Sequence, residues 1–220
     1  MRLILIRHGN TATDNPEKCY GFTDIDLSDE GYDQAEKLAE RFKSEKIDAI
    51  YSSSLMRGRA TAEIIAGSHG LEVITTPELN EVNFGQIEGV TFEEACGLFP
   101  ELTDLWRCGS TKVCFPLGER FLDFAARVTG FTGRLKTHRE DDTIMLVGHG
   151  GPYKVLVCSL LGLPLEHYWQ FRFVMASVSI IDVYSTGAIL EKLSDTSHLT
   201  YSGGKLGTKI DSANRRREER

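Results

Sequence analysis

The chain has 220 residues, 41% of them hydrophobic and 26% charged, which suits one soluble globular domain with a sizeable core. A formal net charge of −7 at pH 7 excludes nucleic acid as the expected partner, because a polyanion is repelled. Five cysteines without C-x-x-C spacing argue against a disulfide framework or a structural zinc site and favour reduced thiols in a cytoplasm. The longest apolar stretch is too short to span a bilayer and no leader precedes the first strand, so we expect a cytoplasmic protein without a membrane partner.

The first predicted element is a strand over residues 3–6, where four apolar residues follow one another. Apolar residues at every position, and not at alternate ones, are typical of a strand covered on both faces, as in a parallel sheet between helices. Arg7, His8 and Gly9 come directly after it. Because ligands of open α/β sheets bind beyond the carboxyl ends of the strands, these three residues are candidates for a site.

Helices and strands alternate over the next part of the chain. Ser28 is a predicted N-cap for a helix, a second strand is expected near residues 47–53, a helix from Arg57 to about residue 68, and a third strand near 71–76. This alternation predicts crossover connections and a parallel sheet of the α/β class. The pattern then breaks into short helical pieces at about 83–116, which we interpret as an inserted lid, before one helix at about 119–136.

The pattern of the opening strand recurs near the end of the chain. Residues 144–147 are again all apolar and lead to His149 and Gly150, with Pro152 placed for the first turn of a helix. Residues 177–193 alternate and predict an antiparallel hairpin at a sheet edge, where a second copy can pair to give a homodimer. Residues 201–220 lack an apolar period and are predicted to be a mobile tail.

The two histidines that follow buried strands have three interpretations. Each is an ordinary buried histidine, or both bind a metal together with Glu81, or both serve an oxyanion site. Arg7 beside His8 argues against a divalent metal, because a fixed cation favours an anion instead. Arg7 and Arg57 offer planar forks of N–H donors that suit a phosphate group.

Chemistry on a phosphate ester requires a nucleophile and an acid. Neighbouring arginines favour the neutral form of His8, whose ring nitrogen is then free to attack phosphorus. Glu81 and Glu88, in ELNEVNFGQIEG, are candidates for the general acid that protonates the leaving oxygen.

Five segments, in this order, resemble those of the histidine phosphatase superfamily. They are LILIRHGNT, GFTDIDLSDEGYDQA, SSSLMRGRATAEII, ELNEVNFGQIEG and LVGHGG, and the resemblance covers most of residues 1–200. It implies a three-layer α/β/α sandwich with a mostly parallel central sheet and an inserted lid, in one domain over residues 1–200. It also implies a phosphohistidine at His8, a phosphate pocket completed by Arg7, Arg57 and His149, Glu81 as proton donor, and neither metal nor cofactor. Further residues expected to contact the substrate or its phosphate are Thr11, Asn15, Gly21 and Gly150.

Within the superfamily, the sequence resembles phosphatases more than mutases. Gly150-Gly151 after His149 is phosphatase-like, and the ending LSDTSHL is similar to that of α-ribazole phosphatases. Departures from the family pattern are Asp14 at a usual asparagine, Gly58 at a usual alanine, and Arg120, which we hypothesise adds positive charge near the far end of the substrate.

The sequence therefore predicts a metal-independent phosphomonoesterase that hydrolyses a small phosphorylated metabolite, with α-ribazole 5′-phosphate as a candidate. A cofactor-dependent phosphoglycerate mutase is the nearest alternative. A phosphate-binding module without catalysis is an alternative of another class, although it has no evident need for Glu81. A metallohydrolase is the least favoured alternative.

Overall fold

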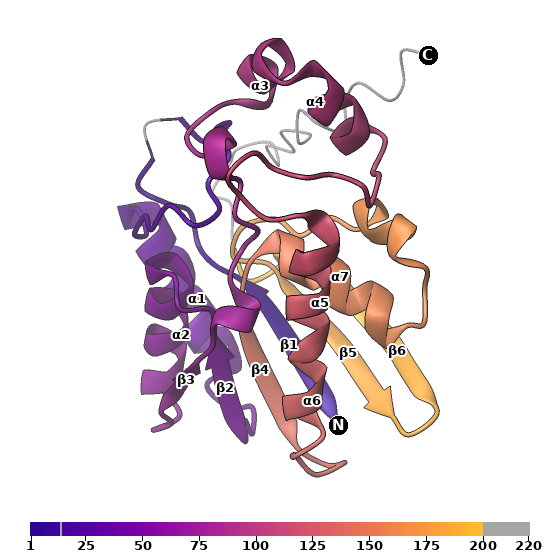
Figure 1. The fold of residues 1–220 in the computed structure, drawn as a ribbon. Helices are drawn as coiled ribbons and strands as arrows, with labels where there is room; N and C mark the ends of the chain where they lie inside the picture. Colours follow the sequence, from indigo (N-terminus) through magenta and orange to yellow (C-terminus); the bar gives the residue numbers. More distant parts are fainter. Residues whose placement is uncertain (14, 200–220) are drawn as a thin grey trace.

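The computed structural model describes residues 1–13 and 15–199, which form a six-stranded sheet between helices (Figure 1). The strand order is β3-β2-β4-β1-β5-β6, in which the first four strands are parallel and the last two pair antiparallel. The strands are β1 (Arg2–Arg7), β2 (Ala49–Ser52), β3 (Val73–Thr75), β4 (Thr143–Gly148), β5 (Val178–Tyr184) and β6 (Gly187–Asp195). The expected α/β fold with a mostly parallel sheet is confirmed.

Helices cover both faces of the sheet. On one face lie α1 (Asp29–Phe42) and α2 (Met56–Gly67), and on the other lie α5 (Phe121–Gly130), α6 (Thr132–Leu135) and α7 (Gly150–Leu160). Along β1, Leu3 and Leu5 belong to the core beneath α5 and α7, whereas Ile4 and Ile6 belong to the core beneath α1 and α2. The unbroken apolar run thus follows from burial on both faces.

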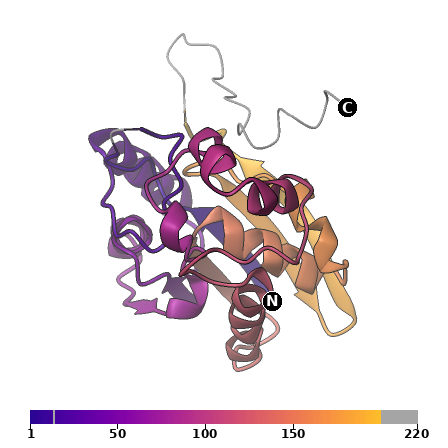
Figure 2. The ribbon, with the colours of Figure 1, turned by 45° about the horizontal axis from the view of Figure 1, so that its top comes forward.

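The segment between β3 and α5 forms the expected lid. It contains two short 3-10 helices, η1 (Pro77–Leu79) and η2 (Gly85–Ile87), followed by α3 (Phe92–Leu98) and α4 (Pro100–Arg107). Helices α3 and α4 lie above the carboxyl ends of the parallel strands (Figures 1 and 2). The ring of Trp106 lies within 5.3–5.4 Å, between centroids, of the rings of Phe84, Phe92 and Phe115, so aromatic packing holds the lid together.

Two details of the helices test the sequence predictions. Ser28 caps α1 as expected, because its Oγ accepts a hydrogen bond from the N–H of Gly31 at 3.1 Å. The single helix predicted over 119–136 is wrong: it is divided at Phe131 into α5 and α6. The N–H of Phe131 donates to the carbonyl oxygen of Val128, three residues back, which tightens the last turn of α5 and ends the α-helical ladder.

The C-terminal part ends in η3 (Leu165–Gln170) and the antiparallel hairpin β5–β6, as the alternating pattern predicts. The predicted tail at 201–220 and the unusual Asp14 lie outside the described residues. Over residues 1–13 and 15–199, no helix combines the length and apolar character that crossing a membrane requires.

Candidate active site

The two predicted histidines meet at the carboxyl end of the sheet. Strands β1 and β4 pair in parallel with Arg7 opposite Gly148, so His8 and His149 leave adjacent strands side by side. Their ring centroids are 5.0 Å apart, and both side chains are buried, with exposures of 4% and 0%.

The hydrogen bond of His8 defines which ring nitrogen carries the proton. Its Nδ1 lies 2.8 Å from the carbonyl oxygen of Gly9. A carbonyl oxygen only accepts, so Nδ1 is the donor and Nε2 of the neutral ring keeps its lone pair. Burial, followed by the charges of Arg57 and Arg7, lowers the pKa of His8 well below its usual value, and the bond to Gly9 opposes this shift. At pH 7 the ring is therefore neutral, with Nε2 able to act as a nucleophile.

Arg57, in the first turn of α2, is 2% exposed and holds the loop that follows β1. Its guanidinium donates to the carbonyl oxygens of Thr23 at 3.0 Å and Gly21 at 2.7 Å. Arg7 donates through Nη1 to the carbonyl oxygen of Phe173, and its Cζ lies 3.7 Å from where a Cβ on Gly150 would be. The charges of both arginines act on both histidines, so the site is electropositive and suits an anion.

Glu81 is held against the start of α7. Its two carboxylate oxygens accept hydrogen bonds from the N–H groups of Val82 at 2.9 Å and Gly151 at 3.1 Å. A Cβ on Gly151 would lie 2.0 Å from Oε1 of Glu81, so residue 151 has to be glycine for the carboxylate to occupy this place. Since Gly151 is two residues from His149, the carboxylate of Glu81 lies against the backbone that follows this histidine.

Glu88, the other candidate acid, has a different position. Its carboxylate accepts hydrogen bonds from the backbone N–H groups of Gly21, Phe22, Thr23 and Phe84 and from the hydroxyl of Thr23, at 2.6 to 3.1 Å. Four of these five donors belong to residues 21–23, the loop whose carbonyl groups bind Arg57. Glu88 therefore anchors the loop, which leaves Glu81 as the carboxylate beside the histidines.

The remaining predicted contact residues have local partners. Thr11 forms an isolated bridge with Leu27, and Oδ1 of Asn15 accepts from the N–H of Glu17 at 2.9 Å. A Cβ on Gly21 would lie 1.9 Å from the carbonyl oxygen of Val82, so this loop passes close to the Glu81 segment. Arg120, at the start of α5, has a side chain that is 67% exposed and an Nε 3.9 Å from a carboxylate oxygen of Asp123. The hypothesis that Arg120 adds positive charge near the far end of the substrate stays a prediction.

Sequence reasoning missed Ser53. Its Oγ lies 2.8 Å from Nε2 of His149, and Nδ1 of His149 is buried without a hydrogen-bond partner among the described residues. Burial, then the charges of Arg57 and His8, lower the pKa of His149 well below its usual value, so this ring is neutral as well. A Cβ on Gly58 would lie 2.4 Å from the Oγ of Ser53, which explains how glycine at this position makes room for the contact.

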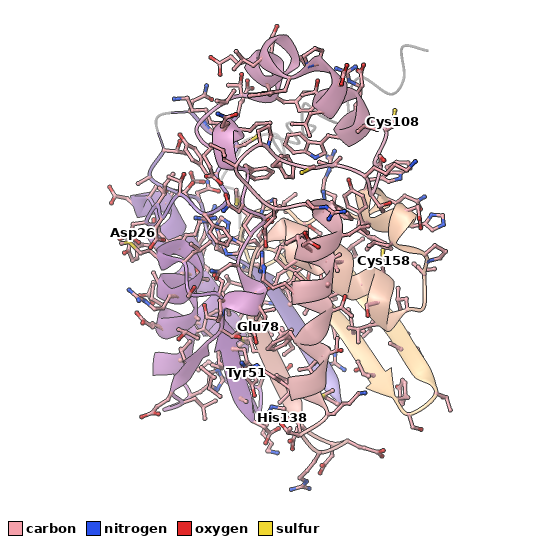
Figure 3. The ribbon with its side chains drawn as sticks, viewed as in Figure 1. Asp26, Tyr51, Glu78, Cys108, His138 and Cys158 are labelled. Atoms are coloured by element: carbon pink, nitrogen blue, oxygen red, sulfur yellow. The ribbon has the colours of Figure 1, made fainter. Side chains whose placement is uncertain are left out.

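Sequence reasoning also missed Arg127 of α5, which donates through Nη2 to the carbonyl oxygen of Glu81 at 3.2 Å. A second polar cluster lies at the end of the sheet away from the lid (Figure 3). There the hydroxyl of Tyr51 lies 2.9 Å from Nε2 of His138. In the part of the chain that the structure describes, no group of three or more His, Cys, Asp or Glu side chains has a metal-binding arrangement.

Known proteins resemble this chain in sequence and in fold. The sequence model of the histidine phosphatase superfamily (branch 1) matches residues 3–196. Phosphoserine phosphatase 1 of Hydrogenobacter thermophilus is 34% identical over 199 residues, covering 90% of this chain and 94% of that protein. Adenosylcobalamin/alpha-ribazole phosphatase of Escherichia coli is 32% identical over 194 residues, covering 88% and 95%.

A solved structure of another protein has a similar fold. The crystal structure of a putative alpha-ribazole-5'-P phosphatase from Escherichia coli superposes with a TM-score of 0.82 at 31% identity, over 89% of this chain and 96% of that one. Sequence and fold agree with each other over nearly the whole described chain, and the chain belongs to the histidine phosphatase superfamily.

Proposed function

We propose that this enzyme hydrolyses a small phosphomonoester through a phosphohistidine on His8, without a metal or cofactor. The observation that carries the proposal is the state of His8: a buried, neutral ring with Nδ1 bonded to Gly9 and Nε2 free for attack, in an electropositive site. Phosphatase activity agrees with the family and with the phosphatases that resemble the chain.

In the first step, Nε2 of His8 attacks phosphorus while the bond from phosphorus to the alcohol oxygen breaks. Glu81 gives its proton to that leaving oxygen. Arg7, Arg57 and His149 stabilise the charge on the transferring group, and the backbone at Gly150 lines the same pocket. Contacts with the substrate or its phosphate are also proposed for Thr11, Asn15 and Gly21, which lie between β1 and α1.

In the second step, water attacks the phosphorus of the phosphohistidine. Glu81, now a carboxylate, takes the proton of the water, and the bond between phosphorus and Nε2 breaks to return neutral His8 and inorganic phosphate. Each group thus returns to its starting state, so no other reactant is consumed.

The relatives supply the first substrates to test, since one is named a phosphoserine phosphatase and another an alpha-ribazole phosphatase. We propose α-ribazole 5′-phosphate and phosphoserine as candidate substrates, and a cytoplasmic location, which the cysteine usage supports. We also propose a homodimer that forms through the exposed edge strand β6. Size-exclusion chromatography tests this proposal.

The deciding experiment measures release of inorganic phosphate from a panel of phosphomonoesters, with and without EDTA. His8→Ala is the variant, and His69→Ala, after α2, is the matched control. We expect release that is unchanged by EDTA and by His69→Ala and is abolished by His8→Ala, with acid-labile phosphate found on the wild-type protein during turnover. Transfer of the phosphoryl group to a second metabolite instead of to water would indicate a mutase. Binding of a phosphomonoester without any transfer would indicate a non-catalytic module.

A further inference from the structure

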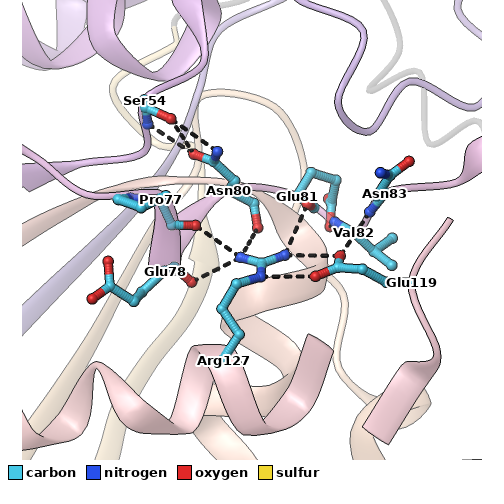
Figure 4. A network of polar contacts seen from close by, with 9 residues as sticks. All are labelled: Ser54, Pro77, Glu78, Asn80, Glu81, Val82, Asn83, Glu119 and Arg127. Atoms are coloured by element: carbon cyan, nitrogen blue, oxygen red, sulfur yellow. Dashed lines mark hydrogen bonds and ion pairs between the residues drawn. The ribbon is translucent and has the colours of Figure 1, made fainter. Parts of the chain in front are cut away.

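Arg127, on α5, binds the backbone of the segment that carries Glu81 (Figure 4). Its Nη1 donates to the carbonyl oxygens of Pro77 at 2.9 Å, Glu78 at 3.1 Å and Asn80 at 3.0 Å. Its Nη2 donates to the carbonyl oxygen of Glu81 itself at 3.2 Å. One guanidinium thus binds four carbonyl groups of the segment that leads to the carboxylate.

Glu119 connects Arg127 to the backbone on the other side of Glu81. Its carboxylate accepts from Nε and from Nη2 of Arg127, both at 2.9 Å, in the fork geometry of a strong ion pair. The same carboxylate accepts from the N–H of Asn83 at 2.8 Å, and the N–H of Glu119 donates to the carbonyl oxygen of Asn83 at 2.9 Å. The side chains of Arg127 and Glu119 are each 20% exposed, so water screens this pair only in part.

A third contact ties the segment to α2. The side-chain oxygen of Asn80 accepts from the N–H and the hydroxyl of Ser54, at 2.8 and 3.0 Å. Ser54 lies just before the helix that carries Arg57. The backbone at Glu81 is therefore fixed between α5 and the start of α2, and the place of its carboxylate follows from the place of this backbone.

We propose that Arg127, together with Glu119, is a positioning residue for the acid step. It fixes the backbone of Glu81 so that the carboxyl group reaches the leaving oxygen, and its hydrogen bonds go to backbone carbonyl groups and to the carboxylate of Glu119. The inference rests on the proposed function, because the acid role of Glu81 is part of that function. Lysine keeps the charge of Arg127 but lacks the planar fork that reaches several acceptors at once.

The test compares two leaving groups in wild type and Arg127→Lys. Nitrophenolate departs without a proton, whereas the alcohol of an alkyl phosphate such as phosphoserine requires one. We expect kcat/KM for the alkyl phosphate to fall about 10- to 100-fold, the scale of a misplaced catalytic group. For p-nitrophenyl phosphate we expect a fall of less than about threefold, since the acid contributes little to that reaction.

A matched control and a second test variant separate a positioning role from a general loss of folding. Arg134→Lys is the matched control, because Arg134 contacts the same segment through the side chain of Glu78 at 2.9 Å; we expect both substrates to stay within about twofold of wild type. Glu119→Gln is the second test variant, used if Arg127→Lys fails to fold by thermal unfolding, and we expect it to show the same selective loss.

The double variant Arg127→Lys/Glu81→Gln decides whether Arg127 acts through Glu81. If it does, adding Arg127→Lys to Glu81→Gln costs less than about threefold with the alkyl phosphate, because the acid is already lost. Equal losses for both leaving groups, or fully additive losses in the double variant, would overturn the positioning role while wild-type activity upholds the proposed function. A wild type that hydrolyses neither substrate would overturn the proposed function and this role with it.

Discussion

The rings of His8 and His149 lie 5.0 Å apart between centroids and are tilted by 59° at the ends of adjacent strands. Two imidazolium cations at this separation, beside Arg7 and Arg57, would repel one another strongly in a buried site. Burial and these charges lower the pKa of both histidines, so the pair is neutral at pH 7. The site thus combines uncharged imidazoles with permanently charged guanidinium groups.

This pair predicts an unusual titration of the free protein. In NMR spectra, the imidazole signals of His8 and His149 should stay constant as the pH is lowered through about 6.5, where an unperturbed histidine titrates. The signals are assigned by their loss in His8→Ala and His149→Ala, and the urea-unfolded protein is the reference. A midpoint near 6.5 for either signal in the folded protein would contradict the prediction.

The same shifts predict how stability depends on pH. Because both histidines have a lower pKa in the folded state, the unfolded chain takes up protons below about pH 6.5 that the folded chain does not. The free energy of unfolding should therefore fall with the pH below this value, by up to about 1.4 kcal/mol per pH unit for each histidine, and these groups add no dependence well above it. Urea unfolding measures this slope.

A third histidine provides a comparison for that slope. Burial, followed by the charge of Arg41, lowers the pKa of His198 to about 4. His198→Gln should therefore make the fall in unfolding free energy less steep, without affecting the active site. An unchanged slope in this variant would show that His198 takes no part.

Replacing Ser53 tests the orientation of His149. Ser53→Ala leaves Nε2 of the buried ring without its partner at 2.8 Å, which should lower the free energy of unfolding by about 1–3 kcal/mol. We expect kcat to fall about tenfold, equivalent to about 1.4 kcal/mol of transition-state stabilisation. Ser68→Ala, at the far end of α2, is the control for loss of a hydroxyl. Wild-type kcat in Ser53→Ala would show that His149 needs no such partner.

Gly151→Ala tests the place of the Glu81 carboxylate. The added Cβ would lie 2.0 Å from Oε1 of Glu81, so the carboxylate has to move. Hydrolysis of an alkyl phosphate should fall about 100-fold, and that of p-nitrophenyl phosphate much less. Gly133→Ala is the matched control, because a Cβ there meets nothing within 4 Å, and it should stabilise α6 by about 0.5–1 kcal/mol. Full activity of Gly151→Ala would place the acid elsewhere.

Glu88→Gln tests the loop anchor. An amide nitrogen does not accept hydrogen bonds, so part of the set of donors from Gly21 to Thr23 loses its acceptor. The free energy of unfolding should fall by about 1–3 kcal/mol, and KM should rise because the loosened loop holds Arg57 less firmly. Steady-state kinetics and urea unfolding measure both effects. Glu93→Gln, on the exposed side of α3, is the control; matching values for the two variants would remove the anchor role.

The sequence predicts the strand ends better than their surroundings. Unbroken apolar runs mark β1 and β4, and because parallel strands end at one edge, His8 and His149 are expected together. Ser53 also follows a buried strand, but its contact with His149 depends on β2 lying next to β4, a neighbour relation that no residue pattern reveals.

The roles of Arg127 and Glu88 could not be predicted from the sequence, for two further reasons. Arg127 binds mostly backbone carbonyl groups, which every residue type has, so its partners leave no trace in the sequence. Glu81 and Glu88 are close in the chain, but Gly85 between them has a φ of 55°, and the chain turns there. Which of the two carboxylates faces the histidines is decided by that turn.

The strand order also has a consequence for how the protein is made. β4 is the fourth strand in the chain but lies between β2 and β1. A nascent chain that ends before Thr143 already contains His8, Arg57 and Glu81, yet it lacks the strand with which β1 and β2 both pair. Because such distant pairings form late in folding, the pocket closes only after the ribosome has delivered most of the polypeptide. A partly synthesised chain that ends before Thr143 thus contains His8, Arg57 and Glu81, but we expect it to have no phosphatase activity.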